Sequence, residues 1–245
     1  MSRILLFMNV MKKFVRTVMF HIAGFIDYWT KGKVKPNHIT VLSLLGHIPV
    51  AWALVTCRPV LAAILLAFFS LLDALDGALA KVQNSASLSG MFFDAVSDRM
   101  KEVIVFSALA VFVYKHIDPS LTWQVVAACG TSLLISYTKA KGEMAVAGKI
   151  AEKDTQKINR LFGIGIASYE IRVAAIVAGL LFGIIEYVLP LLIAANLLTV
   201  ALRFIVISKE LYEIDQKEHS EKLKSKKPVT KEIQAKQKPP SKKKK

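Results

Sequence analysis

The sequence predicts an all-α membrane protein with six transmembrane helices, an N-terminal interfacial helix before them and a disordered basic tail after them. Three observations support this fold class: 54% of the 245 residues are hydrophobic, only 21% are charged, and the apolar residues gather in six long runs. A soluble domain is usually less apolar and more charged. The composition therefore excludes an ordinary soluble domain.

Residues 1–35 predict a helix that lies in the membrane interface. Large apolar side chains from Phe7 to Phe25 recur at helical spacing, whereas basic residues from Arg3 to Arg16 take the other face. A secretory signal peptide is the alternative, but basic residues interrupt the apolar run and no small-residue cleavage site follows it. We therefore expect an amphipathic helix that binds the bilayer surface without crossing it.

Six apolar runs within residues 36–208 are long enough to cross a bilayer. A hydrocarbon core of about 30 Å needs about 20 helical residues. These runs form one transmembrane domain and leave almost nothing for a separate soluble domain. The predicted spans are residues 38–57, 59–82, 89–114, 121–141, 163–186 and 188–208.

The basic residues of the connections predict the orientation of these spans. With a cytoplasmic N-terminus, 27 of the 33 Lys and Arg residues fall on the cytoplasmic side, and only Arg58 and Lys115 fall on the opposite side. Cytoplasmic connections of membrane proteins carry such an excess of positive charge. An even number of spans then places both termini in the cytoplasm.

Residues 209–245 predict a largely disordered basic tail, because 13 Lys stand there against 6 acidic residues with few large apolar side chains. Attraction to anionic membrane lipid accounts for this charge better than recruitment of RNA or of a partner.

Elsewhere the basic residues flank apolar runs, so no nucleic acid is expected as a partner. Cys57 and Cys129 show no ligand spacing and are expected to be packing residues.

Four aspartates lie inside the second and third predicted spans. Each would oppose insertion by about 2.5 to 3.5 kcal/mol if it faced lipid near the bilayer centre, so we expect them to face a polar cavity. Asp73 and Asp76 are three residues apart, and Asp94 and Asp98 are four apart, so each pair shares one helix face. The short connection makes the two helices antiparallel neighbours. The four carboxylates are therefore expected to face one another.

Such a group of carboxylates requires protons or cations. Two carboxylates about 5 Å apart repel by about 3 kcal/mol at an effective dielectric constant of 20. Oxygen ligands without His or Cys select hard divalent cations, here Mg²⁺ or Mn²⁺, and four aspartates suit two ions better than one. At 1.5 Å per residue, Asp76 and Asp98 lie about 9 to 14 Å below the cytoplasmic boundary, so the site faces the cytoplasm. The predicted metal ligands are Asp73, Asp76, Asp94 and Asp98.

The segment from Asp73 to Asp98 resembles the signature of the CDP-alcohol phosphatidyltransferases, a family of six-span membrane enzymes. In this chain the segment is Asp73-x2-Asp76-Gly77-x2-Ala80-Lys81-x8-Gly90-x3-Asp94-x3-Asp98, which matches the family at seven of eight fixed positions. The exception is Lys81, where the family has Arg, and Lys cannot make a bidentate contact to a phosphate. The resemblance covers most of residues 36–208, which it makes the catalytic domain.

The resemblance implies transfer of a phosphatidyl-type group from a CDP-linked lipid to an acceptor hydroxyl, with release of CMP. Three of the aspartates would hold metal, and Asp98 would share it or act as the general base. Small residues such as Gly77 allow close approach of a ligand, although tight helix packing explains a single glycine equally well. The family also suggests a homodimer. The residues expected near the nucleotide are Gly77, Ala80, Lys81, Gly90, Asn37 and Thr40.

Basic residues near the cytoplasmic ends of the later spans suit an acceptor that carries its own phosphate. The segment Ser136-Tyr137-x-Lys139-Ala140-Lys141-x-Glu143 is similar to the Ser-Tyr-x-x-Ala-Arg-x-Glu segment of the branch that makes phosphatidyl- or archaetidylinositol phosphate. Inositol phosphate is therefore the expected acceptor and glycerol 3-phosphate the alternative. The donor lipid, diacylglycerol or archaeol, stays open. The predicted ligands of the acceptor phosphate are Lys139, Lys141, Arg172, Arg203 and Ser136.

Two other function classes use acidic residues within membranes. Aromatic prenyltransferases bind isoprenyl diphosphate through Mg²⁺, but they usually have more spans and an Asn where this chain has Leu72. A cation transporter would account for intramembrane acids. It would leave Gly77 and Gly90 unexplained.

Overall fold

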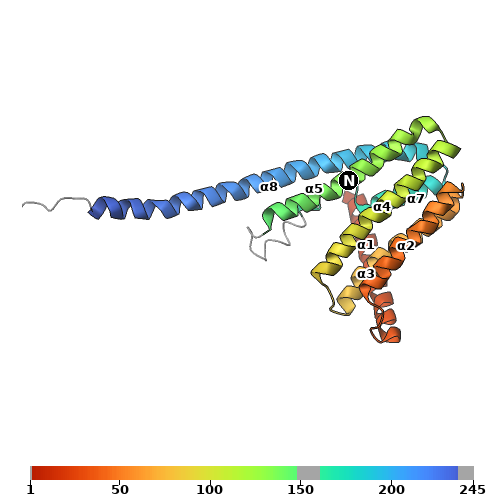
Figure 1. The fold of residues 1–245 in the computed structure, drawn as a ribbon, viewed down its shortest axis with the longest axis horizontal. Helices are drawn as coiled ribbons and strands as arrows, with labels where there is room; N and C mark the ends of the chain where they lie inside the picture. The colour runs from red at the N-terminus through yellow and green to blue at the C-terminus, as the bar shows by residue number, and fades with distance from the viewer. Residues whose placement is uncertain (1, 148–160, 237–245) are drawn as a thin grey trace, which may run out of the picture. The chain divides into compact units, whose positions relative to one another are not determined.

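The computed structural model describes residues 2–147 and 161–236 (Figure 1). Within these two ranges the chain forms seven α-helices, one short 3-10 helix and no strand, so the all-α fold class is confirmed. The helices are α1 (Ser2–Thr30), α2 (Pro36–Val55), α3 (Pro59–Val82), α4 (Leu88–His116), η1 (Pro119–Leu121), α5 (Thr122–Val146), α7 (Tyr169–Leu181) and α8 (Ile185–Lys236).

The chain divides into two compact units, and helices α5 and α8 contribute to both. The first unit contains Met1–Ile135 and Ile166–Thr199, and the second contains Ser136–Gly165 and Val200–Lys245. In the first unit, α2 packs against α3 and α4, and α3 also packs against α1 and α7 (Figure 1). Its largest apolar core includes Val50, Leu54, Leu66, Leu109 and Leu189.

Local sequence features fix where the helices of the first unit begin. Pro36 and Pro59 stand at the first helical positions of α2 and α3, where the missing N–H of proline costs no hydrogen bond. Ser87 caps α4, because its Oγ accepts a hydrogen bond from the backbone N–H of Gly90 at 3.1 Å. The chain between α3 and α4 is short, and the two helices run in opposite directions (Figure 1), with α2 packed against both.

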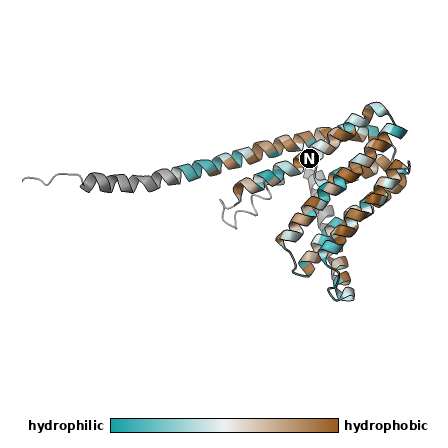
Figure 2. Ribbon diagram, viewed as in Figure 1, coloured by the Kyte–Doolittle hydropathy of each residue, from teal (hydrophilic) through white to brown (hydrophobic). Residues whose placement is uncertain are grey.

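Hydrophobic residues predominate along α2, α3 and the first part of α8 (Figure 2). Leu45, Trp52, Ile64 and Phe68 are each more than half exposed, although a soluble protein would cover such a set. Within the described ranges, α2, α3 and the Ile185–Ser220 part of α8 are long and apolar enough to cross a membrane. These three helices and the apolar surface indicate an integral membrane protein.

The region of the fifth predicted span differs from the prediction. Of residues 163–186, only the 13 residues of α7 and the first two of α8 are helical. At 1.5 Å per residue α7 is about 20 Å long, which is less than the hydrocarbon thickness. Glycines account for the interruptions, since Gly165 and Gly183 adopt positive φ angles of 151° and 66°.

The C-terminal tail also differs from the prediction. Helix α8 continues to Lys236, where the sequence predicts a largely disordered chain from residue 209 onward. Lys, Glu and Gln are good helix formers, and Glu213 and Lys217 are spaced four residues apart, which favours a continuing helix. The low apolar content of the tail excludes a buried core but does not exclude a helix. Residues 237–245 lie outside the described chain.

Candidate active site

A cavity of about 250 Å³ lies where α2 begins, α3 ends and α4 begins. These three helix ends meet because α2 packs against both α3 and α4. Lys35, Pro36, Met91 and the short chain from Ser85 to Ser87 complete its wall. Seven of the predicted site residues line this cavity: Asn37, Thr40, Asp76, Gly77, Ala80, Gly90 and Asp94.

The two predicted glycines have different surroundings at this cavity. A Cβ atom built on Gly77 would meet no atom within 4 Å, so this glycine is not explained by tight helix packing. A Cβ on Gly90 would lie 3.0 Å from Ser87 Oγ and 3.5 Å from Asn37 Oδ1. Gly77 thus leaves room for a ligand. Gly90 leaves room for the side chain of Ser87, which caps the start of α4.

Lys81 is the predicted nucleotide residue that is not part of the cavity wall. It lies in the last turn of α3 with an exposed side chain, and it is not among the residues that line the cavity. The last turn of α3 therefore contributes Ala80 to the cavity and directs Lys81 outward.

Hydroxyl groups of α2 hold the two aspartates of α3. Thr40 Oγ1 donates a hydrogen bond to Asp76 Oδ2 at 2.7 Å, and Ser43 Oγ donates to Asp73 Oδ1 at 2.7 Å. Tyr169 Oη, at the start of α7, donates to the other oxygen of Asp73 at 3.2 Å. Both carboxylates are thereby fixed by neutral donors from neighbouring helices.

Lys101 links the aspartates of the two facing helices. Its Nζ lies 2.5 Å from Asp73 Oδ1 on α3 and 2.7 Å from Asp98 Oδ1 on α4. Arg99 lies farther from Asp98, with 3.7 Å between Nη2 and Oδ2. Sequence reasoning missed Lys101, although it follows Asp98 by three residues and Asp94 by seven and so shares their helix face.

The polar atoms at the cavity can be compared with the ligands that the divalent cation implied by the family resemblance would need. The carboxylates and hydroxyls at the cavity are hard oxygen ligands, which suit Mg²⁺ or Mn²⁺. Among the residues that the structure describes, however, no group of three or more Asp, Glu, His or Cys side chains is placed to hold a metal. The chemistry of the site fits a hard cation at Asp76 and Asp94, whereas Lys101 occupies the position between Asp73 and Asp98.

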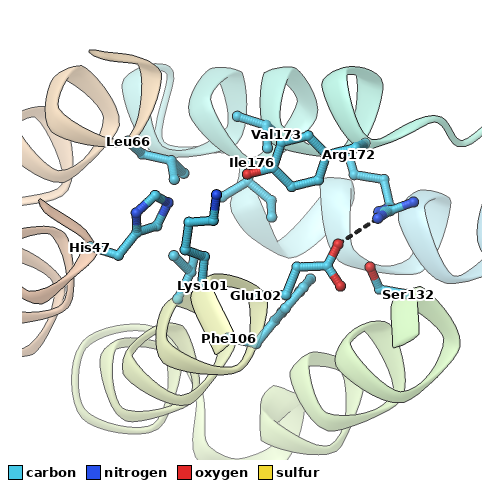
Figure 3. A pocket seen from close by; sticks show the side chains of 11 residues that line it. His47, Leu66, Lys101, Glu102, Phe106, Ser132, Arg172, Val173 and Ile176 are labelled. Carbon is cyan, nitrogen blue, oxygen red and sulfur yellow. Dashed lines mark hydrogen bonds and ion pairs between the residues drawn. The ribbon is translucent and has the colours of Figure 1, made fainter. Parts of the chain in front are cut away.

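A second, smaller cavity of about 20 Å³ lies deeper in the first unit (Figure 3). His47, Lys101, Glu102 and Arg172 contribute polar groups to its wall. Arg172 Nη2 pairs with Glu102 Oε1 at 2.5 Å, and Nη1 donates to the carbonyl of Ala167 at 2.9 Å. The pair is buried, with 5% and 6% of the two side chains exposed. His47 is also buried.

The Glu102 contact changes the interpretation of Arg172. A buried guanidinium requires an anionic partner, and the sequence prediction assigned that role to the acceptor phosphate. The structure supplies Glu102, which lies 70 residues away in the chain. Arg172 therefore connects α7 to α4.

The other predicted acceptor residues, Ser136, Lys139, Lys141 and Arg203, belong to the second unit. Lys139 Nζ lies 3.6 Å from Glu143 Oε1, and each side chain is more than a third exposed. Arg203 is buried, and its Nε donates to the carbonyl of Ile164 at 2.9 Å. Their grouping around one phosphate stays a prediction.

A family model for CDP-alcohol phosphatidyltransferases matches residues 33–185. The chain belongs to this family. A phosphatidylinositol phosphate synthase from Corynebacterium glutamicum is 31% identical over 168 residues, which cover 64% of this chain and 77% of the relative. An archaetidylinositol phosphate synthase from Pyrococcus horikoshii is 29% identical over 137 residues, which cover 55% and 69%.

Solved structures show the same fold. A crystal structure of the Mycobacterium tuberculosis phosphatidylinositol phosphate synthase with CDP-DAG bound superposes with a TM-score of 0.65 at 21% identity, covering 78% of this chain and 94% of that one. A structure of the same enzyme in complex with manganese and citrate gives 0.64 at 22% identity, covering 77% and 88%.

Membership of the CDP-alcohol phosphatidyltransferases decides between the function classes that the sequence left open. The protein is a transferase of substituted phosphate groups. The family match includes all four aspartates and the wall of the larger cavity. It contradicts the prenyltransferase and transporter alternatives.

Proposed function

We propose that this phosphatidyltransferase transfers the phosphatidyl-type group of a CDP-linked lipid to a hydroxyl of inositol phosphate and releases CMP. One observation carries the proposal: the larger cavity gathers seven residues that the family signature and the start of α2 predicted from sequence. They come from three separate helices. Close packing does not explain Gly77 among them, because this glycine faces open space.

The cavity suits the CDP part of the donor. Its volume of about 250 Å³ is just below the usual range for a small-molecule site, which fits a donor whose lipid chains stay in the bilayer. Gly77, Ala80 and Gly90 let the pyrophosphate approach the helix backbones, while Asn37 and Thr40 offer polar groups to the nucleotide. We assign Lys81 an outer contact to the donor, in keeping with its exposure.

A divalent cation, Mg²⁺ or Mn²⁺, would be held by the aspartates, with Asp76 and Asp94 at the cavity as first ligands. Such an ion neutralises pyrophosphate charge and stabilises a departing phosphate. The manganese complex of the Mycobacterium tuberculosis enzyme supports the use of a divalent cation. Thr40 orients Asp76 for this role.

Asp98 is the proposed general base. The acceptor hydroxyl oxygen attacks the lipid-linked phosphorus, and its proton moves to an Asp98 carboxylate oxygen. The bond from that phosphorus to the bridging oxygen breaks, and CMP leaves with the electron pair. Asp98 is about a quarter exposed, so an acceptor can reach it, and Lys101 holds its orientation.

Inositol phosphate is the proposed acceptor because the named relatives are inositol phosphate enzymes and this chain carries the similar Ser136–Glu143 segment. Lys139, Lys141, Arg203 and Ser136 would bind its phosphate. Lys139 is available for this, since it is exposed and its contact to Glu143 is long. Arg172 would not bind the phosphate directly, because its guanidinium is paired with Glu102 on α4.

The membrane arrangement follows from the same proposal. We assign six spans to residues 36–208, a cytoplasmic active site, cytoplasmic termini and a homodimer. Helix α1 would lie in the interface, because Phe25, Tyr28 and Trp29 near its end are largely exposed, as aromatic side chains at a membrane interface are. The basic residues after 208 would contact anionic lipid.

The test is CMP release by the purified protein with Mg²⁺ and either CDP-diacylglycerol or CDP-archaeol. Inositol phosphate, glycerol 3-phosphate and serine are supplied in separate reactions. We expect CMP only with inositol phosphate, and the preferred lipid identifies the donor. Release with glycerol 3-phosphate alone would replace the proposed acceptor, and no release with any acceptor would contradict the proposed reaction.

A further inference from the structure

The ammonium group of Lys101 lies between the aspartates of α3 and α4 that form the proposed metal site. Only 1% of its side chain is exposed, and it is among the largest fully buried side chains in the described part of the molecule. A buried ammonium is strongly unfavourable unless carboxylates pair with it. Asp73 and Asp98 provide that pairing from two different helices.

The four aspartates are thereby divided into two pairs at different depths. Asp76 and Asp94 line the larger cavity, six residues from the end of α3 and six from the start of α4. Asp73 and Asp98 lie about one helical turn deeper and share Lys101. The shallow pair faces the space for the donor, and the deep pair is already bridged by a positive charge.

The surroundings of Lys101 keep its ammonium group in this position. Figure 3 shows its side chain extending from α4 into the bundle beside His47. Apolar groups of Leu66, Val105 and Ile176 belong to the same wall. An ammonium displaced from Asp73 and Asp98 would remain buried without a carboxylate, which strongly disfavours its displacement by a second metal ion.

We propose that Lys101 takes the place of one of the two divalent cations expected from four aspartates, so that the site binds a single ion at Asp76 and Asp94. Lys101 is in this sense a positioning residue: it holds Asp73 and Asp98 together across α3 and α4 without touching the donor. This inference rests on the proposed metal-dependent function and sets the number of ions, which that function leaves open.

The experiment is a count of bound Mn²⁺. The purified full-length protein in detergent is titrated with Mn²⁺, and the free ion is measured by electron paramagnetic resonance. We expect one Mn²⁺ per wild-type chain and two per Lys101→Met chain, with spin coupling between the ions in the variant, because two-metal sites hold their ions about 4 Å apart. Lys101→Arg keeps the charge and should bind one.

Lys115→Met is the matched control, because Lys115 is an exposed lysine of the same helix, and we expect it to bind one ion. Two ions on the wild-type chain would overturn the proposal, and so would one ion on a folded Lys101→Met chain. If Lys101→Met does not fold, the wild-type count decides. No bound Mn²⁺ on the wild type would instead contradict the proposed metal dependence.

Discussion

The hydrogen bond from Thr40 to Asp76 is the contact that ties the start of α2 to the cavity carboxylates. Its donor and acceptor are 36 residues apart and both are buried, so it is shielded from competing water. Hydrogen bonds to charged groups contribute about 1.5 to 3 kcal/mol. Thr40 thus fixes the Asp76 carboxylate at the cavity where the proposed cation and donor phosphate would lie.

Replacing Thr40 with valine should reduce the rate constant of CMP release by about 10- to 100-fold, because the shape is kept and only the donor is lost. The Thr40→Ser variant keeps the hydroxyl and should retain most of the activity. Steady-state kinetics on both variants, together with their thermal stability, separates the two effects. Equal activity of the valine and serine variants would show that this hydrogen bond does not support the reaction.

Individual residues also show which contacts could be predicted from the sequence and which could not. Helical spacing places all four aspartates on facing surfaces, and the family signature adds the glycines, because both depend on short separations along the chain. Ser43, Tyr169 and Glu102 had no such signal, since each acts on a residue at least 30 positions away. Arg172 illustrates the limit: its burial predicts an anionic partner, but the sequence cannot tell a substrate phosphate from a carboxylate of another helix.

At the scale of helices, glycine has three different functions in this bundle. In α2, a Cβ on Gly46 would lie 2.1 Å from the ring of Phe69, so this glycine permits close packing of α2 on α3. In α3, Gly77 faces the cavity, and in α5, Gly130 faces open space away from the residues of that cavity. The same substitution at these three sites therefore has three expected results.

Gly77→Ala should stabilise α3 by about 0.5 to 1 kcal/mol, because alanine favours a helix and meets no neighbour. It should also raise the KM for the CDP-linked lipid at least tenfold, because the methyl group occupies donor space. Gly130→Ala should stabilise equally with unchanged kinetics, whereas Gly46→Ala should lower the melting temperature through overpacking. Unchanged KM in the Gly77→Ala variant would contradict its proposed place at the donor.

The helices themselves were predictable to different degrees. Hydropathy placed α2, α3 and α4 within two residues of their observed ends, because proline and serine mark their starts and polar turns mark their ends. It failed at residues 163–186, where apolar glycine-containing segments continue the hydropathy signal through chain that is not helical. It also failed after residue 208, since low hydropathy excludes burial but leaves helix propensity unchanged.

At the scale of the whole molecule, the distribution of charge predicts which side of the membrane the proposed donor site faces. The proposed cytoplasmic connections and termini carry 27 Lys and Arg residues, whereas the opposite connections carry two. The turn between α2 and α3 contains Cys57, which is exposed, and the turn between α3 and α4 contains the exposed Ser85. These two positions lie at opposite ends of α3, so thiol labelling at each reports the orientation of that helix.

In a Cys129→Ala background, a membrane-impermeant maleimide should label Cys57 in intact cells but not in inverted membrane vesicles. A chain that also carries Cys57→Ser and Ser85→Cys should show the reverse pattern, because the positive-inside bias places the α3–α4 turn in the cytoplasm. The Cys57→Ser, Cys129→Ala chain is the unlabelled control. Labelling of Cys57 only in inverted vesicles would reverse the proposed topology, and labelling of both positions from one side would show that α3 does not cross the membrane.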